Sequence, residues 1–120
     1  MGTSVLAPLR FGEFVLDEAG FALRRNERPV ALEPRALKLL LHLARNRQRA
    51  VPREELAAIL WPDSVVSDTS LKEAVNLARR AVGDGADAQR VVATLRGHGY
   101  RFVATVDELE APVALAAARP

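Results

Sequence analysis

Apolar residues alternate with polar ones near both ends of the chain and recur at helical spacing in the middle. In residues 9–32, short apolar runs are separated by polar turns, and Phe14 and Leu16 illustrate the period of two. This segment predicts three or four short antiparallel strands. Pro29 restricts the last strand to a sheet edge or a strand start, because proline cannot donate to a central ladder.

The first of three predicted helices runs from Pro34 to Asn46, and proline suits the first helical position. Polar residues recur every three or four positions in one stripe, and leucines cover most of the remaining surface. A helix that is apolar around most of its circumference is a central core helix. His42 lies on the polar stripe, where we expect a solvated surface residue.

The second helix is predicted after Pro52, with Glu54 and Glu55 in a first turn where the helix dipole favours anions. Pro62 opposes continuation of this helix beyond Trp61. Three apolar residues mark its buried face: Leu56, Ile59 and Leu60.

The third helix begins near Ser67 or Asp68, since both residue types are good N-caps. It runs to Val82 and ends before Gly83, a residue suited to a left-handed terminator. Its apolar positions form one narrow stripe: Leu71, Val75, Ala78 and Val82. The other positions of this helix must therefore face outward.

Residues 90–95 and 100–104 predict a β-hairpin near the end of the chain, joined through residues 96–99. Gly97 and Gly99 allow positive φ and a close backbone approach at its turn, and Arg96 stands at the tip. The sequence after Val106 is acidic and then rich in Ala and Pro.

These patterns divide the chain into three parts. We assign residues 1–8 to an N-terminal tail and residues 9–105 to one folded domain. Residues 106–120 are expected to form a linker or a truncated tail.

Composition narrows the class of protein. Hydrophobic residues make up 49% of the 120 residues, which is enough for a core. The chain has no cysteine, which excludes disulfides, thiolate zinc sites and cysteine nucleophiles and suits a reducing cytosol. No signal peptide, lipidation signal or membrane-length apolar run is evident, so a cytoplasmic location is expected.

The net charge is small, but nearly all of the basic residues are arginine. The formal net charge is +2, and only Lys38 and Lys72 among the 17 basic residues are lysine. Arginine suits bidentate contacts with phosphate and guanine. A GC-rich coding bias explains the same composition equally well, so position must decide between the two explanations.

Enzymatic chemistry has little support. There are two histidines, no Gly-rich phosphate loop after a strand and no HExxH motif. Glu54 and Glu55 are adjacent and hence lie on different helix faces. We expect no catalytic residue, no metal site and no cofactor.

Strands, three helices and a hairpin, in that order, make an α+β winged helix-turn-helix. Three segments carry a closer resemblance: "REELAAILWP" (53–62), "SDTSLKEAVNLARRAVGD" (67–84) and "RGHGYRF" (96–102). Together, at this spacing, they resemble the OmpR/PhoB-type DNA-binding domain of bacterial transcriptional regulators. The resemblance covers about residues 9–105 and also implies the N-terminal antiparallel sheet.

The resemblance implies that the third helix enters the major groove of duplex DNA and that Arg96 reaches the minor groove from the hairpin, or wing. Twelve residues are our candidate DNA contacts: Trp61, Thr69, Ser70, Glu73, Asn76, Leu77, Arg79, Arg80, Thr94, Arg96, Tyr100 and Arg101.

Three of these candidates have a second interpretation. Trp61 either meets a phosphate or fills a half-buried gap in the core. Glu73 either accepts from a cytosine amine or repels phosphate. Leu77 stands where many members have arginine; it could touch a thymine methyl, or it could mean a rotated helix or weak sequence reading.

Further partners are implied by the resemblance alone. The resemblance implies that residues 61–67 lie where relatives touch RNA polymerase. It also implies tandem or dimeric binding on direct repeats of DNA. The predicted sheet starts close to Met1, so we expect no receiver domain before it and a further domain after the Ala/Pro-rich end. The rival function is a winged helix that binds protein instead of DNA, which the low net charge and Leu77 favour slightly.

Overall fold

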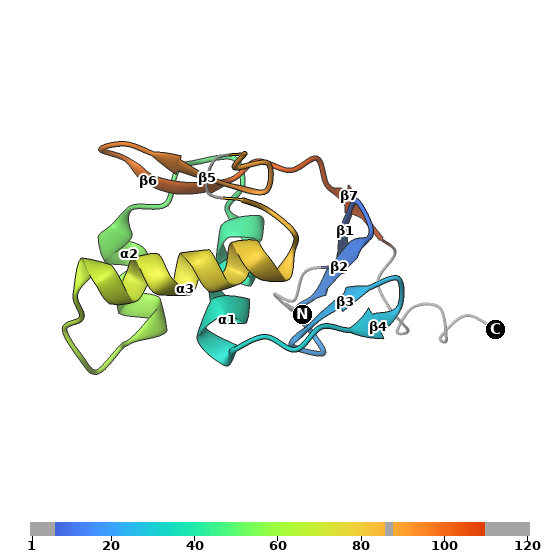
Figure 1. The fold of residues 1–120 in the computed structure, drawn as a ribbon, viewed down its shortest axis with the longest axis horizontal. Coiled ribbons are helices and arrows are strands. Elements are labelled where there is room, and N and C mark those ends of the chain that lie inside the picture. The colour runs from blue at the N-terminus through green and yellow to red at the C-terminus, as the bar shows by residue number, and fades with distance from the viewer. Residues whose placement is uncertain (1–6, 86–87, 110–120) are drawn as a thin grey trace, which may run out of the picture. The chain divides into compact units, whose positions relative to one another are not determined.

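The computed structural model describes residues 7–85 and 88–109 (Figure 1). The described residues divide into two compact units, residues 7–31 with 105–109, and residues 32–85 with 88–104.

The first unit is a five-stranded antiparallel sheet with the strand order β4-β3-β2-β1-β7. Its strands are β1 (Leu9–Phe11), β2 (Phe14–Asp17), β3 (Ala22–Arg25), β4 (Arg28–Pro29) and β7 (Asp107–Glu108). Four strands within residues 9–32 confirm the expected pattern, and Pro29 lies in an edge strand as predicted. Leu9, Leu16 and Leu23 lie opposite one another in register and are buried.

The fifth strand of this sheet was not predicted. Asp107 and Glu108 fall in the segment assigned to a linker, yet they pair with Arg10 and Leu9 of β1. The backbone N–H of Leu109 also donates to the Pro8 carbonyl at 2.8 Å. The sheet therefore extends past residue 105, the predicted end of the domain.

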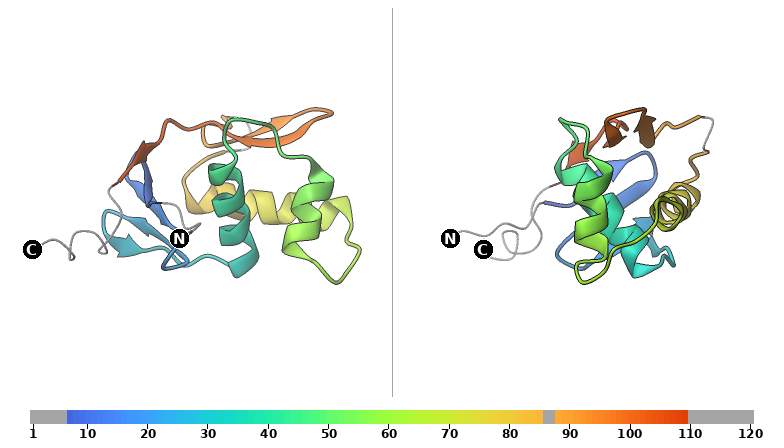
Figure 2. Two further views of the ribbon diagram at one scale, coloured as in Figure 1. Left: turned by 180° about the vertical axis from the view of Figure 1, so that it is seen from behind. Right: turned by 90° about the vertical axis from the view of Figure 1, so that its left-hand side faces the viewer.

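The second unit contains the three predicted helices and the hairpin (Figure 2). Its elements are α1 (Pro34–Arg45), α2 (Arg53–Leu60), α3 (Asp68–Ala81), β5 (Val92–Leu95) and β6 (Gly99–Phe102). The α1 helix is the core helix expected from its leucines, all five of which are buried. Leu56 and Leu60 of α2 are buried, whereas Ile59 is only partly so.

The α3 helix has the phase that its apolar stripe predicts. Leu71, Val75, Ala78 and Val82 are all buried. Ser67 caps the helix, because its Oγ accepts from the Ser70 backbone N–H at 3.2 Å. Gly83 follows the end of the helix with φ +70°, the expected left-handed conformation.

The environment of His42 differs from the sequence expectation. It is half-buried, and its Nε2 lies 2.7 Å from Oε2 of Glu55 in α2. Nη2 of Arg49 lies 2.7 Å from the same oxygen. Hydrogen bonds from Arg49 and then from His42 lower the pKa of Glu55 to about 2. His42 is therefore not a free surface residue, because a carboxylate from the next helix reaches it.

Candidate nucleic-acid interface

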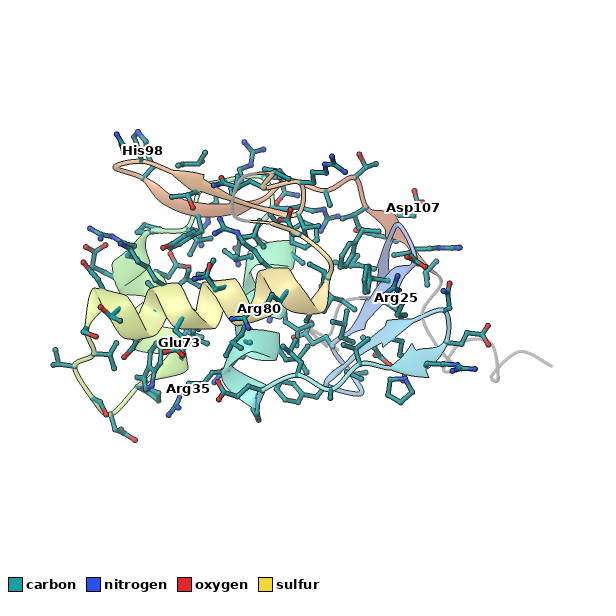
Figure 3. All side chains as sticks on the ribbon, in the orientation of Figure 1. Arg25, Arg35, Glu73, Arg80, His98 and Asp107 are labelled. Carbon is teal, nitrogen blue, oxygen red and sulfur yellow. The ribbon has the colours of Figure 1, made fainter. Side chains whose placement is uncertain are left out.

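The outward face of α3 is mostly polar. Thr69, Glu73, Asn76 and Arg80 are exposed, together with Lys72. Figure 3 shows Glu73 and Arg80 on this helix and His98 at the tip of the hairpin. Ser70 and Leu77 are half-buried at the margins of the same face. Most of the major-groove candidates thus share one side of one helix.

The hairpin has four paired residues in each strand and a basic tip. Leu95 and Gly99 form its last pair, and the His98 N–H donates to the Leu95 carbonyl at 2.7 Å. Gly97 and Gly99 have φ of +82° and +110°, which confirms the positive φ predicted at the turn. Arg96 is exposed, and within the described part of the chain it has no hydrogen-bond or ion-pair partner.

The hairpin is also tied to the segment between α1 and α2. Val51 and Tyr100 exchange two backbone hydrogen bonds, of 2.7 and 3.0 Å. The Nε of Arg101 donates to the Arg47 carbonyl at 2.9 Å. Arg101 is half-buried.

Trp61 follows α2 and is half-buried. The guanidinium of Arg35 lies over its ring at 5.0 Å from the centroid, while the Arg35 Nε donates to the Leu60 carbonyl at 3.1 Å. Trp61 is thus a packing partner of α1 with an exposed part.

Two candidates lie in the interior. Arg79 is 6% exposed and Tyr100 is 4% exposed. The Arg79 Nε and Nη2 donate to the Val92 carbonyl at 3.1 and 3.0 Å, and Nη2 also donates to the Thr94 Oγ1 at 2.8 Å. Little of either side chain is left at the surface for the DNA contacts predicted for Arg79 and Tyr100. As DNA contacts, both residues stay predictions.

The fold of this chain also appears in known proteins. The family model described as "Transcriptional regulatory protein, C terminal" matches residues 27–102. The chain belongs to this family. The match confirms the predicted OmpR/PhoB-type winged helix, and this family is one of transcription regulation.

Relatives of this transcriptional regulatory domain are longer proteins. Transcriptional regulatory protein AfsQ1 of Streptomyces coelicolor is 33% identical over 93 residues, which cover 77% of this chain and 41% of AfsQ1. The chain therefore spans about two fifths of the length of that relative.

Solved structures share the fold of the domain. The response regulator DrrB of Thermotoga maritima, an OmpR/PhoB homologue, aligns with a TM-score of 0.73 and 28% identity over 81% of this chain and 44% of DrrB. The Klebsiella pneumoniae RstA DNA-binding domain, solved in complex with the RstA box, aligns with a TM-score of 0.69 over 80% of this chain and 96% of RstA. At 22% identity, the RstA likeness shows a common fold.

A buried acid that sequence reasoning missed organises the chain between α3 and the wing of this transcriptional regulatory domain. Asp84 is 7% exposed. Its carboxylate accepts the backbone N–H groups of Arg90, Val91 and Val92 at 2.7, 2.9 and 3.0 Å. Burial would raise the pKa of Asp84, but these three donors and the charge of Arg79 together hold it below its usual value.

Asp84→Asn is expected to destabilise the domain by ~1–3 kcal/mol at neutral pH, because an amide offers one acceptor oxygen to three donors. A lowered pKa gives stability that is present above the ordinary aspartate value and is lost as pH falls through the folded-state value. The difference in unfolding free energy between parent and variant should therefore shrink below about pH 4. Urea denaturation from pH 7 to 3 measures it, and a constant difference would contradict the role of the carboxylate.

None of the helices in the described ranges is both long and apolar enough to cross a membrane. No group of three or more His, Cys, Asp and Glu side chains suited to a metal ion occurs among those residues.

Proposed function

We propose that this domain binds duplex DNA in the regulation of transcription, with α3 in the major groove and the wing at the minor groove. The observation that carries this proposal is the pairing of two exposed surfaces within one unit. A polar face of α3 lies beside a hairpin whose tip presents Arg96 without a protein partner among the described residues. Membership of a transcriptional regulatory family supports it, as does the RstA domain bound to its box.

The contacts fall into two classes. We propose that Thr69, Glu73, Asn76 and Leu77 meet base edges, because they lie along the outward side of α3. We assign the phosphate contacts to candidate residues that are exposed or half-buried: Trp61, Ser70, Arg80, Thr94 and Arg101. Arg96 enters the minor groove, where narrow A·T-rich stretches attract arginine.

The salt dependence of binding tests this function. The affinity of the chain for random-sequence duplex should fall as salt rises, with a slope of log affinity against log salt of about −0.9 per phosphate contacted. The rival, a winged helix that binds protein through α3, predicts no measurable affinity for duplex DNA at low salt.

Arg96→Ala is expected to weaken DNA binding by ~1–3 kcal/mol, with the larger loss on A·T-rich duplexes. Its side chain is exposed at the wing tip, so its removal should leave the fold unchanged. Fluorescence anisotropy with A·T-rich and G·C-rich duplexes measures both effects. His98→Ala, at the same tip, is the matched control. Equal affinity of the Arg96 variant and the parent on every duplex would refute the minor-groove role.

Leu77→Arg is expected to raise the affinity for DNA about tenfold on duplexes that carry a suitably placed guanine, since a bidentate contact is worth ~1–3 kcal/mol. Leu77 is half-buried at the margin of the outward face, so a long side chain can extend toward the groove. A phosphate contact alone would help all duplexes alike and steepen the salt slope by about one unit. Leu77→Met controls for side-chain length. A folded Arg variant that binds no duplex better would show that position 77 does not meet DNA.

The proposal also includes a protein partner, RNA polymerase, and the bounds of the DNA-binding module. The loop 61–67, where Val65 is fully exposed, is our candidate surface for RNA polymerase. Tandem or dimeric binding on direct repeats is a second part of this proposal. The proposed binding module is residues 9–105, and β7 (Asp107–Glu108) adds a strand to its sheet. A cytoplasmic location and the lack of an enzymatic role go with DNA binding as the function of this chain.

A further inference from the structure

The outer edge of β5 is held by side chains. Val92 lies opposite Phe102, but its own backbone groups bond to partners outside the hairpin. Its N–H donates to the Asp84 Oδ2 at 3.0 Å, and its carbonyl accepts from Arg79 at 3.0 and 3.1 Å. Two residues further on, the Thr94 N–H donates to the Gln89 Oε1 at 2.8 Å. Side chains thus replace a neighbouring strand along this edge.

Arg79 is the link between this edge and α3. It belongs to the helix whose outward face carries the proposed base contacts, and its guanidinium joins the Val92 carbonyl to the Thr94 hydroxyl. The opposite edge of the hairpin is fixed by the bridge between Val51 and Tyr100. The hairpin is therefore held from both sides, and Arg96 follows Thr94 by two residues.

Because Arg79 is buried, few other side chains could take its place in this link. A buried polar group needs hydrogen-bond partners, and three hydrogen bonds engage the Nε and Nη2 donors of Arg79 here. A lysine carries the same charge but lacks the planar fork that reaches a carbonyl and a hydroxyl together. The geometry at this place thus calls for arginine in particular.

We propose that Arg79 and Thr94 are positioning residues that lock the wing to α3, so that Arg96 enters the minor groove while α3 occupies the major groove. This inference rests on the proposed function. It replaces a phosphate contact of Arg79 with an internal one, and it gives Thr94 a role through its hydroxyl that is independent of DNA.

The test compares affinities for two probes, an oligo(dA)·oligo(dT) duplex with a narrow minor groove and an alternating d(GC) duplex. The ratio of the two affinities reports wing insertion, and Arg96→Ala should lower it by about tenfold. Thr94→Val should lower the ratio similarly, and adding it to Arg96→Ala should change the ratio little further. Thr94→Ser, which keeps the hydroxyl, should preserve the parent ratio.

Arg79→Lys separates the two roles of Arg79. A direct phosphate contact would survive this change, whereas the lock predicts a lowered ratio. Thermal melts check that each variant is folded, and the mild Thr94 variants decide the matter if the Arg79 variant unfolds.

The inference is overturned if Thr94→Val keeps the parent ratio, or if its effect adds fully to that of Arg96→Ala. A parent chain that binds neither duplex would overturn the proposed function itself, and the lock as a DNA-binding device with it.

Discussion

Gly99→Ala is expected to destabilise the domain by roughly 3–5 kcal/mol, because strain and lost hydrogen bonds act at one site. Gly99 has φ +110°, a conformation that residues with a Cβ rarely adopt. A Cβ here would also overlap the Val51 carbonyl and lie 2.8 Å from the Pro52 Cα, both backbone atoms. The bridge between Val51 and Tyr100 must then open, and the hairpin loses its attachment on that side.

Gly97→Ala is the matched control in the same turn. Gly97 also has positive φ, +82°, but a Cβ there would meet no atom within 4 Å. Its cost should therefore be conformational strain alone, ~1–2 kcal/mol. Urea denaturation of both variants measures the contrast. Equal losses would mean that the close approach to Val51 contributes nothing to stability.

Leu71→Ala is expected to cost ~2–5 kcal/mol, since it removes a large side chain from a site that is only 2% exposed. Leu77→Ala, six residues along the same helix, should cost less than ~1 kcal/mol because that side chain is half-buried at the margin of the outward face. Denaturant midpoints of the two variants give the comparison. A larger loss for Leu77→Ala would mean that the outward face of α3 has been assigned wrongly.

The helices and the wing could be predicted because their signals are local. The spacing of Leu71, Val75, Ala78 and Val82 fixes the phase of α3, and all four are buried. Gly97 and Gly99 mark a turn with positive φ, which the structure has. Each of these signals lies within a few residues of the feature that it specifies.

Arg79 shows the limit of that reasoning. It follows Val75 by four residues and precedes Val82 by three, so helical spacing places it beside the buried stripe. It lies outside that stripe, however, so the pattern places it among the outward-facing residues. The interior accepts it because the Val92 carbonyl and the Thr94 hydroxyl, 13 and 15 residues later, receive its hydrogen bonds.

The other differences have the same cause. Asp84 has no role in the sequence analysis, and the N–H groups that donate to it lie six to eight residues further along the chain. His42 read as solvated, and its partner Glu55 comes from the next helix. The β7 strand consists of two acidic residues joined to β1 through the backbone, so no hydrophobic period could reveal it. Polar contacts between distant segments leave no periodic trace in a sequence.

The side chains that bond to the outer edge of β5 affect what happens when copies of the domain lie close together. A strand with open backbone donors and acceptors at its edge is a template on which a second chain can add a strand, which is a common start of aggregation. Val92 and the Thr94 N–H are already occupied by Asp84, Arg79 and Gln89. Copies of the domain brought close together on neighbouring stretches of a duplex can thus lie side by side without their wings fusing into one continuous sheet.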